Sequence, residues 1–212
     1  MLKCDFKKAR NLLLLGAHAD DIEIGCGGTI LKLARARPDL NILWVVFGAE
    51  GKRRREARAS ARLFLEGTGR SQVLIKQFKT SFFPAQLEEI KTSFEALKRS
   101  FEPDIVFTHY REDRHQDHRL LSDLAWNTFR DHLILEYEVP KYDGDLGIPN
   151  LFVPLKKVIC QQKTKYLGQV FRTQSNKHWF SDDTFMALMR LRGVECASQY
   201  AEAFYCRKMV CG

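Results

Sequence analysis

The sequence lacks any long apolar run: Leu12 to Leu15, the longest near the N-terminus, is too short to span a bilayer or to form a signal-peptide core. No two of its six cysteines form a C-x-x-C pair, which excludes a zinc ribbon or thioredoxin-like motif, and their scatter does not indicate a disulfide framework. Internal repeats, low-complexity segments and linkers are also missing. We therefore expect a cytoplasmic protein with reduced thiols and a single domain over residues 1–212, with a regular core over 1–137 and a less regular part over 138–212.

The charge is not balanced. The formal net charge is +8, and such a surface favours anionic partners through its long-range field. Nucleic acid, a phosphorylated sugar, a sugar nucleotide, a lipid phosphate and an anionic membrane all fit this charge, which does not choose among them. The run Lys52 to Arg55 has no interleaved aromatic residues of the kind that bind single-stranded nucleic acid, so we expect no nucleic-acid partner.

Apolar runs and helical patterns alternate along the first 137 residues, which predicts βαβ units in a parallel sheet. The predicted strands are 12–15, 41–47, 72–75, 105–108 and 133–137, and the predicted helices are 25–37, 53–66, 86–101 and 117–130. The second half predicts helices over 154–167 and 182–192 and a closing strand over 204–209. The expected fold is α/β, a Rossmann-like three-layer sandwich with a mostly parallel sheet.

Histidines and acids cluster directly after the first and fourth predicted strands. The first group is Ala17-His18-Ala19-Asp20-Asp21, the second is Asp113-Arg114-His115-Gln116-Asp117-His118, and His109 ends the fourth strand itself. Ligands bind outside the carboxyl ends of strands in open α/β sheets, so these loops are the place to expect chemistry. A helix N-cap would by itself explain Asp117, but not two such loops in a chain with only six histidines.

Two histidines and a carboxylate from these loops would complete the protein ligands of a catalytic zinc ion: His18, Asp21 and His118. Asp20 would be free to act as a base on water. His115, three residues before His118, could face the same cleft. The glycines at 25–28 lack the G-x-G-x-x-G pattern of a dinucleotide loop, and we expect them to let a helix end approach the metal loop closely.

These motifs resemble the PIG-L/LmbE-like zinc-dependent deacetylases. The family pattern A-H-P-D-D followed by G-x-G-G-T stands here at residues 17–21 and 25–29, and H-x-D-H stands at 115–118. Weaker matches are Arg53 with Glu56, Arg192-Gly193, and Tyr200-Ala201-Glu202-Ala203-Phe204. Ala19 replaces the usual proline and Ile22 a frequent acid, but neither change removes a reacting group.

The resemblance implies removal of an acetyl group from an N-acetylglucosamine-type conjugate, which could be phosphorylated or lipid-linked. In this mechanism Zn²⁺ (or Fe²⁺, which suits the same ligands) is held by His18, Asp21 and His118. Asp20 is the base, and a protonated His115 stabilises the oxyanion. Asp117 orients His115 or His118, and Arg53 binds substrate. The alternatives are a metal-dependent amidase for a non-sugar substrate and a non-catalytic polyanion-binding protein. The sequence leaves a homo-oligomer possible.

Overall fold

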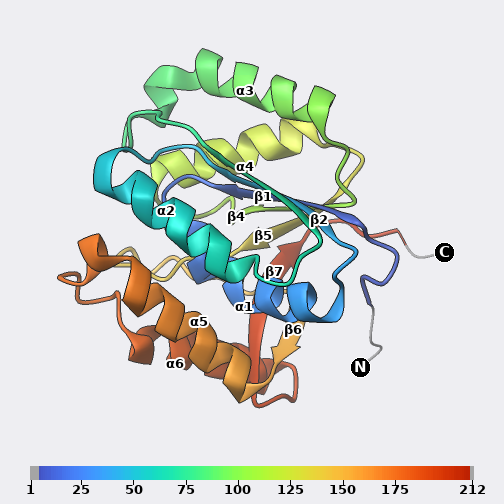
Figure 1. Ribbon diagram of the computed structural model, residues 1–212, viewed down its shortest axis with the longest axis vertical. Helices are drawn as coiled ribbons and strands as arrows, with labels where there is room; N and C mark the ends of the chain where they lie inside the picture. The colour runs from blue at the N-terminus through green and yellow to red at the C-terminus, as the bar shows by residue number, and fades with distance from the viewer. Residues whose placement is uncertain (1–4, 211–212) are drawn as a thin grey trace.

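A computed structural model describes residues 5–210 as a sheet between two layers of helices (Figure 1). The sheet has seven strands in the order β3-β2-β1-β4-β5-β7-β6. Their bounds are β1 Asn11–Gly16, β2 Asn41–Val46, β3 Arg70–Ile75, β4 Ile105–His109, β5 Leu133–Tyr137, β6 Leu151–Leu155 and β7 Tyr200–Cys206. The first five strands pair in parallel, and β7 runs antiparallel to both β5 and β6. The expected α/β fold with a mostly parallel sheet is therefore confirmed.

Each face of the sheet has its own apolar core. Helices α1 (Asp21–Ala36), α2 (Gly51–Phe64), α5 (Lys157–Val170) and α6 (Asp182–Glu195) cover one face. Helices α3 (Leu87–Ser100) and α4 (Gln116–Thr128) cover the other (Figure 1), and short 3₁₀ turns lie at η1 (Phe83–Gln86) and η2 (Arg172–Gln174). The interior strand β1 is buried on both faces, which explains its continuous leucine run.

Two predictions for the second half were wrong. The helix expected from Pro154 begins only at Lys157, because Pro154 and Leu155 belong to a strand, β6, that the sequence did not predict. β6 is an edge strand that pairs only with β7, and an edge tolerates a proline, which has no N–H to donate. The closing strand also begins earlier than expected, at Tyr200, and ends at Cys206.

The topology places the predicted chemistry at one edge of the sheet. β1 and β4 are parallel neighbours, with Leu12 opposite Ile105, so the loops that follow them lie side by side. Among the described residues, no helix is long and apolar enough to cross a membrane. Cys26, Cys160, Cys196 and Cys206 are free thiols, and Cys4 and Cys211 lie outside the described residues.

Candidate active site

One cavity at the carboxyl edge of the sheet gathers six of the seven side chains named from the sequence. It has a volume of about 360 Å³, within the range of small-molecule sites. The six are His18, Asp20, Asp21, Arg53, His115 and His118. The seventh, Asp117, is fully buried and contacts the cavity residue His18. The loop after β1, the first turn of α2 and the N-terminal turn of α4 supply these side chains.

Three nitrogen and oxygen atoms converge in this cavity. His18 Nδ1 lies 3.1 Å from His118 Nε2 and 3.3 Å from Asp21 Oδ2. His118 Nε2 lies 3.5 Å from Asp21 Oδ2. All three side chains are largely shielded from solvent. Atoms of His115 and His109 lie near enough to join this group, which makes the cavity floor the densest cluster of potential metal ligands in residues 5–210.

The spacing of these atoms fits a zinc ion. Tetrahedral zinc with ligands at about 2.0–2.2 Å separates them by roughly 3.3–3.6 Å, close to the three distances between His18, Asp21 and His118. Neutral imidazole nitrogen and carboxylate oxygen are the donors that zinc accepts, and the same set suits Fe²⁺. The residues present therefore fit the metal that the family resemblance implies.

The charges of these groups also favour a cation. Burial would lower the pKa of His18, but Asp21 and Asp117 outweigh it and raise that pKa to about 10. Burial would raise the pKa of Asp21, yet the three histidines His118, His18 and His109 hold it well below its usual value. Both shifts have the same origin, the attraction between the carboxylates of Asp21 and Asp117 and positive charge on the histidines beside them.

The Asp117 carboxylate does not orient His115 or His118, so that expectation was wrong about its partner. Its Oδ2 lies 3.0 Å from His18 Nε2, on the ring edge opposite the converging Nδ1. The same carboxylate accepts hydrogen bonds from the backbone N–H groups of Ser81 and Phe83. Asp117 thus orients His18 and ties the loop after β3 to the site, while only its backbone N–H contacts His115.

A different carboxylate, Asp113, orients His118. Its Oδ2 lies 2.9 Å from His118 Nδ1 and 3.0 Å from Lys141 Nζ. A carboxylate on the second nitrogen of a ligating histidine fixes the ring and its tautomer. No role was predicted from the sequence for either Asp113 or Lys141. The position of Asp113 two residues before His115, in the same cluster of histidines and acids after the fourth strand, was the available signal for it.

His109, the last residue of β4, lies beneath the site. Its Nε2 accepts a hydrogen bond from the Ala17 N–H and lies 3.3 Å from Asp21 Oδ2, and its ring stacks on His118 at 3.9 Å between centroids. His109 therefore fixes the backbone at Ala17, where the loop that carries His18 begins. The sequence placed His109 at the strand end without a role, because its contacts depend on how tightly two loops pack.

Asp20 and Arg53 form an ion pair on the cavity wall. Arg53 Nη2 donates to Asp20 Oδ1 at 2.6 Å, and Arg53 also contacts Thr173 and Glu56. Burial raises the pKa of Asp20, and the Arg53 charge opposes that rise. The second oxygen of this carboxylate, Asp20 Oδ2, can therefore accept a proton. Arg53 lines the cavity while it is bound to Asp20 Oδ1.

His115 enters the cavity as a neutral side chain. Burial, followed by the charge of the nearby His18, lowers its pKa, which is opposite in direction to the shift that the expected protonated form would need. Its Nδ1 accepts a hydrogen bond from the Asp117 N–H, as the N-cap of α4. A neutral imidazole that accepts at Nδ1 carries its proton on Nε2. His115 can therefore still donate one hydrogen bond from Nε2.

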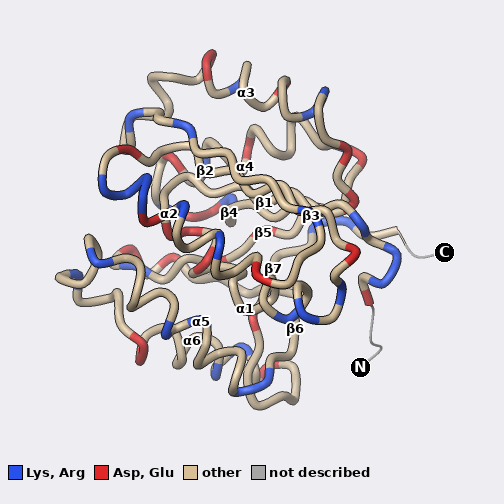
Figure 2. Tube along the Cα trace, viewed as in Figure 1, with Lys and Arg blue, Asp and Glu red and all other residues tan. Residues whose placement is uncertain are grey.

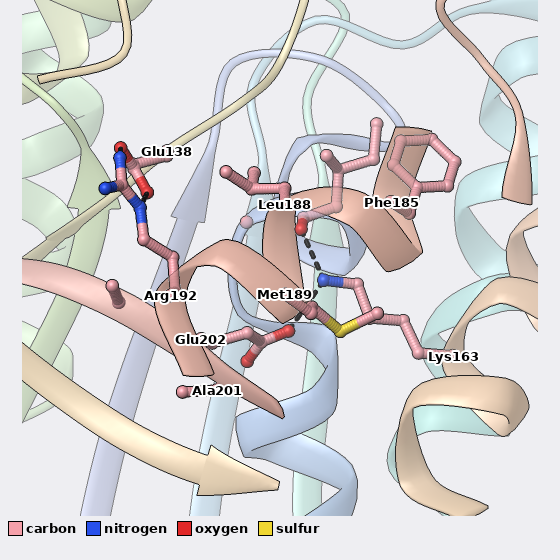
Figure 3. Close-up of a pocket in the computed structure, with 11 residues that line it drawn as sticks. Glu138, Lys163, Phe185, Leu188, Met189, Arg192, Ala201 and Glu202 are labelled. Atoms are coloured by element: carbon pink, nitrogen blue, oxygen red, sulfur yellow. Dashed lines mark hydrogen bonds and ion pairs between the residues drawn. The ribbon is translucent and has the colours of Figure 1, made fainter. Parts of the chain in front are cut away.

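Helix α1, which begins at Asp21, is held in place by buried charged side chains of β7 and α5. Both oxygens of Glu202, on β7, accept from the N–H groups of Gly28 and Thr29, and Lys163, on α5, donates to Glu202 and to the carbonyl of Ile24 (Figure 3). A Cβ at residue 28 would lie 2.9 Å from Glu202 Oε1, so glycine allows this approach. The G-x-G-G-T and Y-A-E segments thus meet in one contact that positions α1.

A second buried pair lies beside the first. Arg192, on α6, donates from Nε to Glu138 Oε2 at 2.9 Å (Figure 3). Arg192 also contacts the carbonyl of Gly147. The space between the two pairs is narrow and lined by Phe185, Leu188 and Met189. This space is packing behind α1, and the wide cavity at the carboxyl edge remains the candidate active site.

The cavity holds two histidines and a carboxylate that can bind a metal, and a further carboxylate, Asp20, that can act as a base. This combination is typical of an enzyme that hydrolyses amides. The chain belongs to the PIG-L family: the family described as GlcNAc-PI de-N-acetylase matches residues 13–129, just over half of the sequence. That range contains both the His18–Asp21 and the His115–His118 motifs.

Three similar proteins illustrate the range of this fold. An uncharacterised deacetylase, YaiS of Escherichia coli, is 30% identical over 146 residues, which cover 63% of this chain and 76% of YaiS. The N,N'-diacetylchitobiose deacetylase of Pyrococcus horikoshii superposes with a TM-score of 0.73 at 22% identity, over 94% of this chain and 84% of that one. GalB, a 4-carboxy-2-hydroxymuconate hydratase of Pseudomonas putida, superposes with a TM-score of 0.74 at 15% identity, over 96% and 98%. Because one fold carries both reactions, the chemistry has to be argued from the site.

Proposed function

We propose that this enzyme removes the acetyl group from an N-acetylated amino sugar, an N-acetylglucosamine-type conjugate, with Zn²⁺ held by His18, Asp21 and His118. The observation that carries the proposal is the convergence of His18 Nδ1, Asp21 Oδ2 and His118 Nε2 within 3.1–3.5 Å, beside Asp20 and His115 in one cavity. The family description and the chitobiose deacetylase support an amino-sugar substrate. Fe²⁺ is the alternative metal for this site.

When bound, the metal supplies Lewis acidity, which lowers the pKa of water and polarises the acetamide carbonyl. Asp20 accepts the proton of the attacking water on the oxygen that Arg53 does not occupy. His115 donates its Nε2–H to the oxyanion of the tetrahedral intermediate, since its Nδ1 is held by the Asp117 N–H. Asp20 then returns the proton to the departing amine, so that acetate and a free amino sugar leave.

Arg53 is the proposed substrate-binding residue. Its guanidinium has five N–H donors, and the bonds to Asp20, Glu56 and Thr173 leave donors for hydroxyl or phosphate oxygens of the sugar. A phosphorylated or lipid-linked conjugate would suit the +8 net charge. We place the enzyme in the cytoplasm and treat the whole chain as one catalytic domain.

The test is primary-amine release from metal-stripped protein that is resupplied with Zn²⁺ or Fe²⁺. The panel contains free N-acetylglucosamine, diacetylchitobiose, N-acetylglucosamine phosphates and the phosphatidylinositol conjugate, with N-acetyl amino acids as non-sugar amides. Metal-restored release from a sugar conjugate is the expected result. Release from the amino acids alone would replace the proposal with a non-sugar amidase.

Asp20→Asn separates the base from the metal ligands. Removal of a general base costs about 10²–10⁴-fold in rate, so we expect kcat to fall by that range while zinc content stays at the wild-type level. Metal analysis of the purified variant and turnover of the best panel substrate measure the two quantities. An Asp20→Asn enzyme with full turnover would refute the assignment of the base.

A further inference from the structure

Three segments around the cavity mouth carry basic residues and no acid, and Glu50, the exposed N-cap of α2, is the acid that lines the cavity beside them. They are residues 51–55 at the start of α2, the loop over residues 76–82, and residues 171–181 between α5 and α6, and each contributes side chains to the cavity lining. Figure 2 shows Lys and Arg gathered on the first turns of α2. The basic residues are Lys52, Arg53, Arg54, Arg55, Lys76, Lys79, Arg172 and Lys177, and we refer to the exposed Lys52, Arg55, Lys79 and Lys177 with Phe82 as the basic rim.

Aromatic rings accompany the lysines of the basic rim. Phe82 is 50% exposed, and Lys79 Nζ lies 4.2 Å from the centroid of its ring. Lys177 Nζ lies 5.6 Å from the centroid of Trp179, a partly buried ring that lines the cavity. Apolar and positively charged groups are therefore presented together at the entrance.

The loop that exposes Phe82 is held firmly. The N–H groups of Ser81 and Phe83 donate to Asp117, and Gln116 donates to the Ser81 carbonyl. Ser81 has a φ of 67°, a left-handed conformation, and the adjacent Phe83 is fully buried. Because the backbone on both sides is fixed, the Phe82 ring is held in contact with water instead of folding back into the core.

We propose that the basic rim binds the surface of an anionic lipid bilayer. Lysines and arginines near such a surface are attracted by its negative potential, and aromatic side chains favour the headgroup level, where they bury apolar area. Duplex nucleic acid would use the cations, but its bases are stacked on one another and offer no free face to the exposed Phe82. Docking in this orientation places the cavity mouth against the headgroups, a property beyond the deacetylation itself.

The experiment is flotation of the purified protein with vesicles of phosphatidylcholine, with and without phosphatidylglycerol. Each lysine near an anionic surface contributes roughly fivefold, so Lys52→Glu with Lys79→Glu is expected to weaken partition more than ~tenfold. The matched control is Lys98→Glu with Arg99→Glu, the same charge change at exposed positions of α3 on the other face of the sheet. Neither Lys52 nor Lys79 lines the cavity, so amine release from a soluble substrate reports correct folding.

A second pair of variants tests the apolar contribution. Phe82→Ser is expected to weaken binding to phosphatidylglycerol vesicles, whereas Leu191→Ser, at an exposed aliphatic residue of α6, leaves it unchanged. Equal loss in the α3 control, or no binding to phosphatidylglycerol vesicles, overturns the proposal. Duplex-DNA binding that depends on Lys52 and Lys79 while vesicle binding does not would overturn it in favour of a nucleic-acid surface. These readouts do not require turnover, so they stand apart from a failure of the proposed reaction.

Discussion

The Asp113 carboxylate restrains His118 from the side away from Asp21, and its removal should loosen a proposed ligand without touching the metal. Loss of such an orienting carboxylate typically costs about 10–100-fold in metal affinity, which is the drop we expect for Asp113→Ala. Competition with a chromogenic zinc chelator measures it. Asp123→Ala, at an exposed acid of α4, is the control. Unchanged affinity in Asp113→Ala would mean that His118 does not hold the metal.

For single residues, the sequence predicted which side chains lie together in the site better than it predicted which carboxylate contacts which histidine. His18, Asp21 and His118 could be expected to meet because parallel neighbouring strands end at one edge. The pairing of Asp113 with His118 and of Asp117 with His18 could not, because both acids lie within five residues of His118 and loop geometry alone decides which ring each reaches.

Among the helices, α1 packs too closely to tolerate a side chain at its first glycine. A Cβ at residue 25 would lie 2.1 Å from the Tyr137 ring, whose hydroxyl donates to the Leu15 carbonyl. We expect Gly25→Ala to destabilise the fold by about 1–3 kcal/mol. Gly168→Ala is the matched variant: Gly168 is an exposed residue of α5, its nearest neighbouring atom would lie 4.0 Å from the new Cβ, and the change should stabilise by about 0.5–1 kcal/mol. Urea unfolding measures both, and the same sign for the two variants would contradict this account.

The buried pair between α5 and β7 leads to a third stability prediction. Lys163→Met leaves Glu202 buried with only the N–H groups of Gly28 and Thr29, and breaking a buried pair costs roughly 3–5 kcal/mol. Lys165→Met, at an exposed position of the same helix, should cost little. Equal free energies of unfolding for the two variants would show that the Lys163 charge does not stabilise the fold.

Element boundaries were predictable where the pattern was regular. The alternation up to β5 follows from leucine- and valine-rich runs separated by amphipathic helices. β6 was missed because Leu151 to Leu155 is short and contains Pro154. The helical pattern that follows it led to a predicted helix that started at Pro154, three residues before α5 begins. The pairing of β6 with β7 joins residues about fifty apart, beyond the reach of local patterns.

For the molecule as a whole, metal removal should lower thermal stability. A ligand that binds only the folded state stabilises it, by about 4 kcal/mol at a thousand times its dissociation constant, and each kcal/mol shifts Tm by roughly 2–4 °C in a chain of this size. We expect chelation to lower Tm and Zn²⁺ to restore it, as followed by calorimetry. Asp21→Asn protein should show no such response. A zinc-induced shift of equal size in that variant would place the ion elsewhere.

The proposed metal site can form only when two distant parts of the chain have come together during folding. His18 and His118 are 100 residues apart, and the pairing of β4 with β1 brings their loops together. A nascent chain that has not yet made residue 118 has no site at all, and closing so long a loop is among the slower steps of folding. Metal uptake during refolding should therefore lag behind helix formation and report the moment at which the centre of the sheet closes.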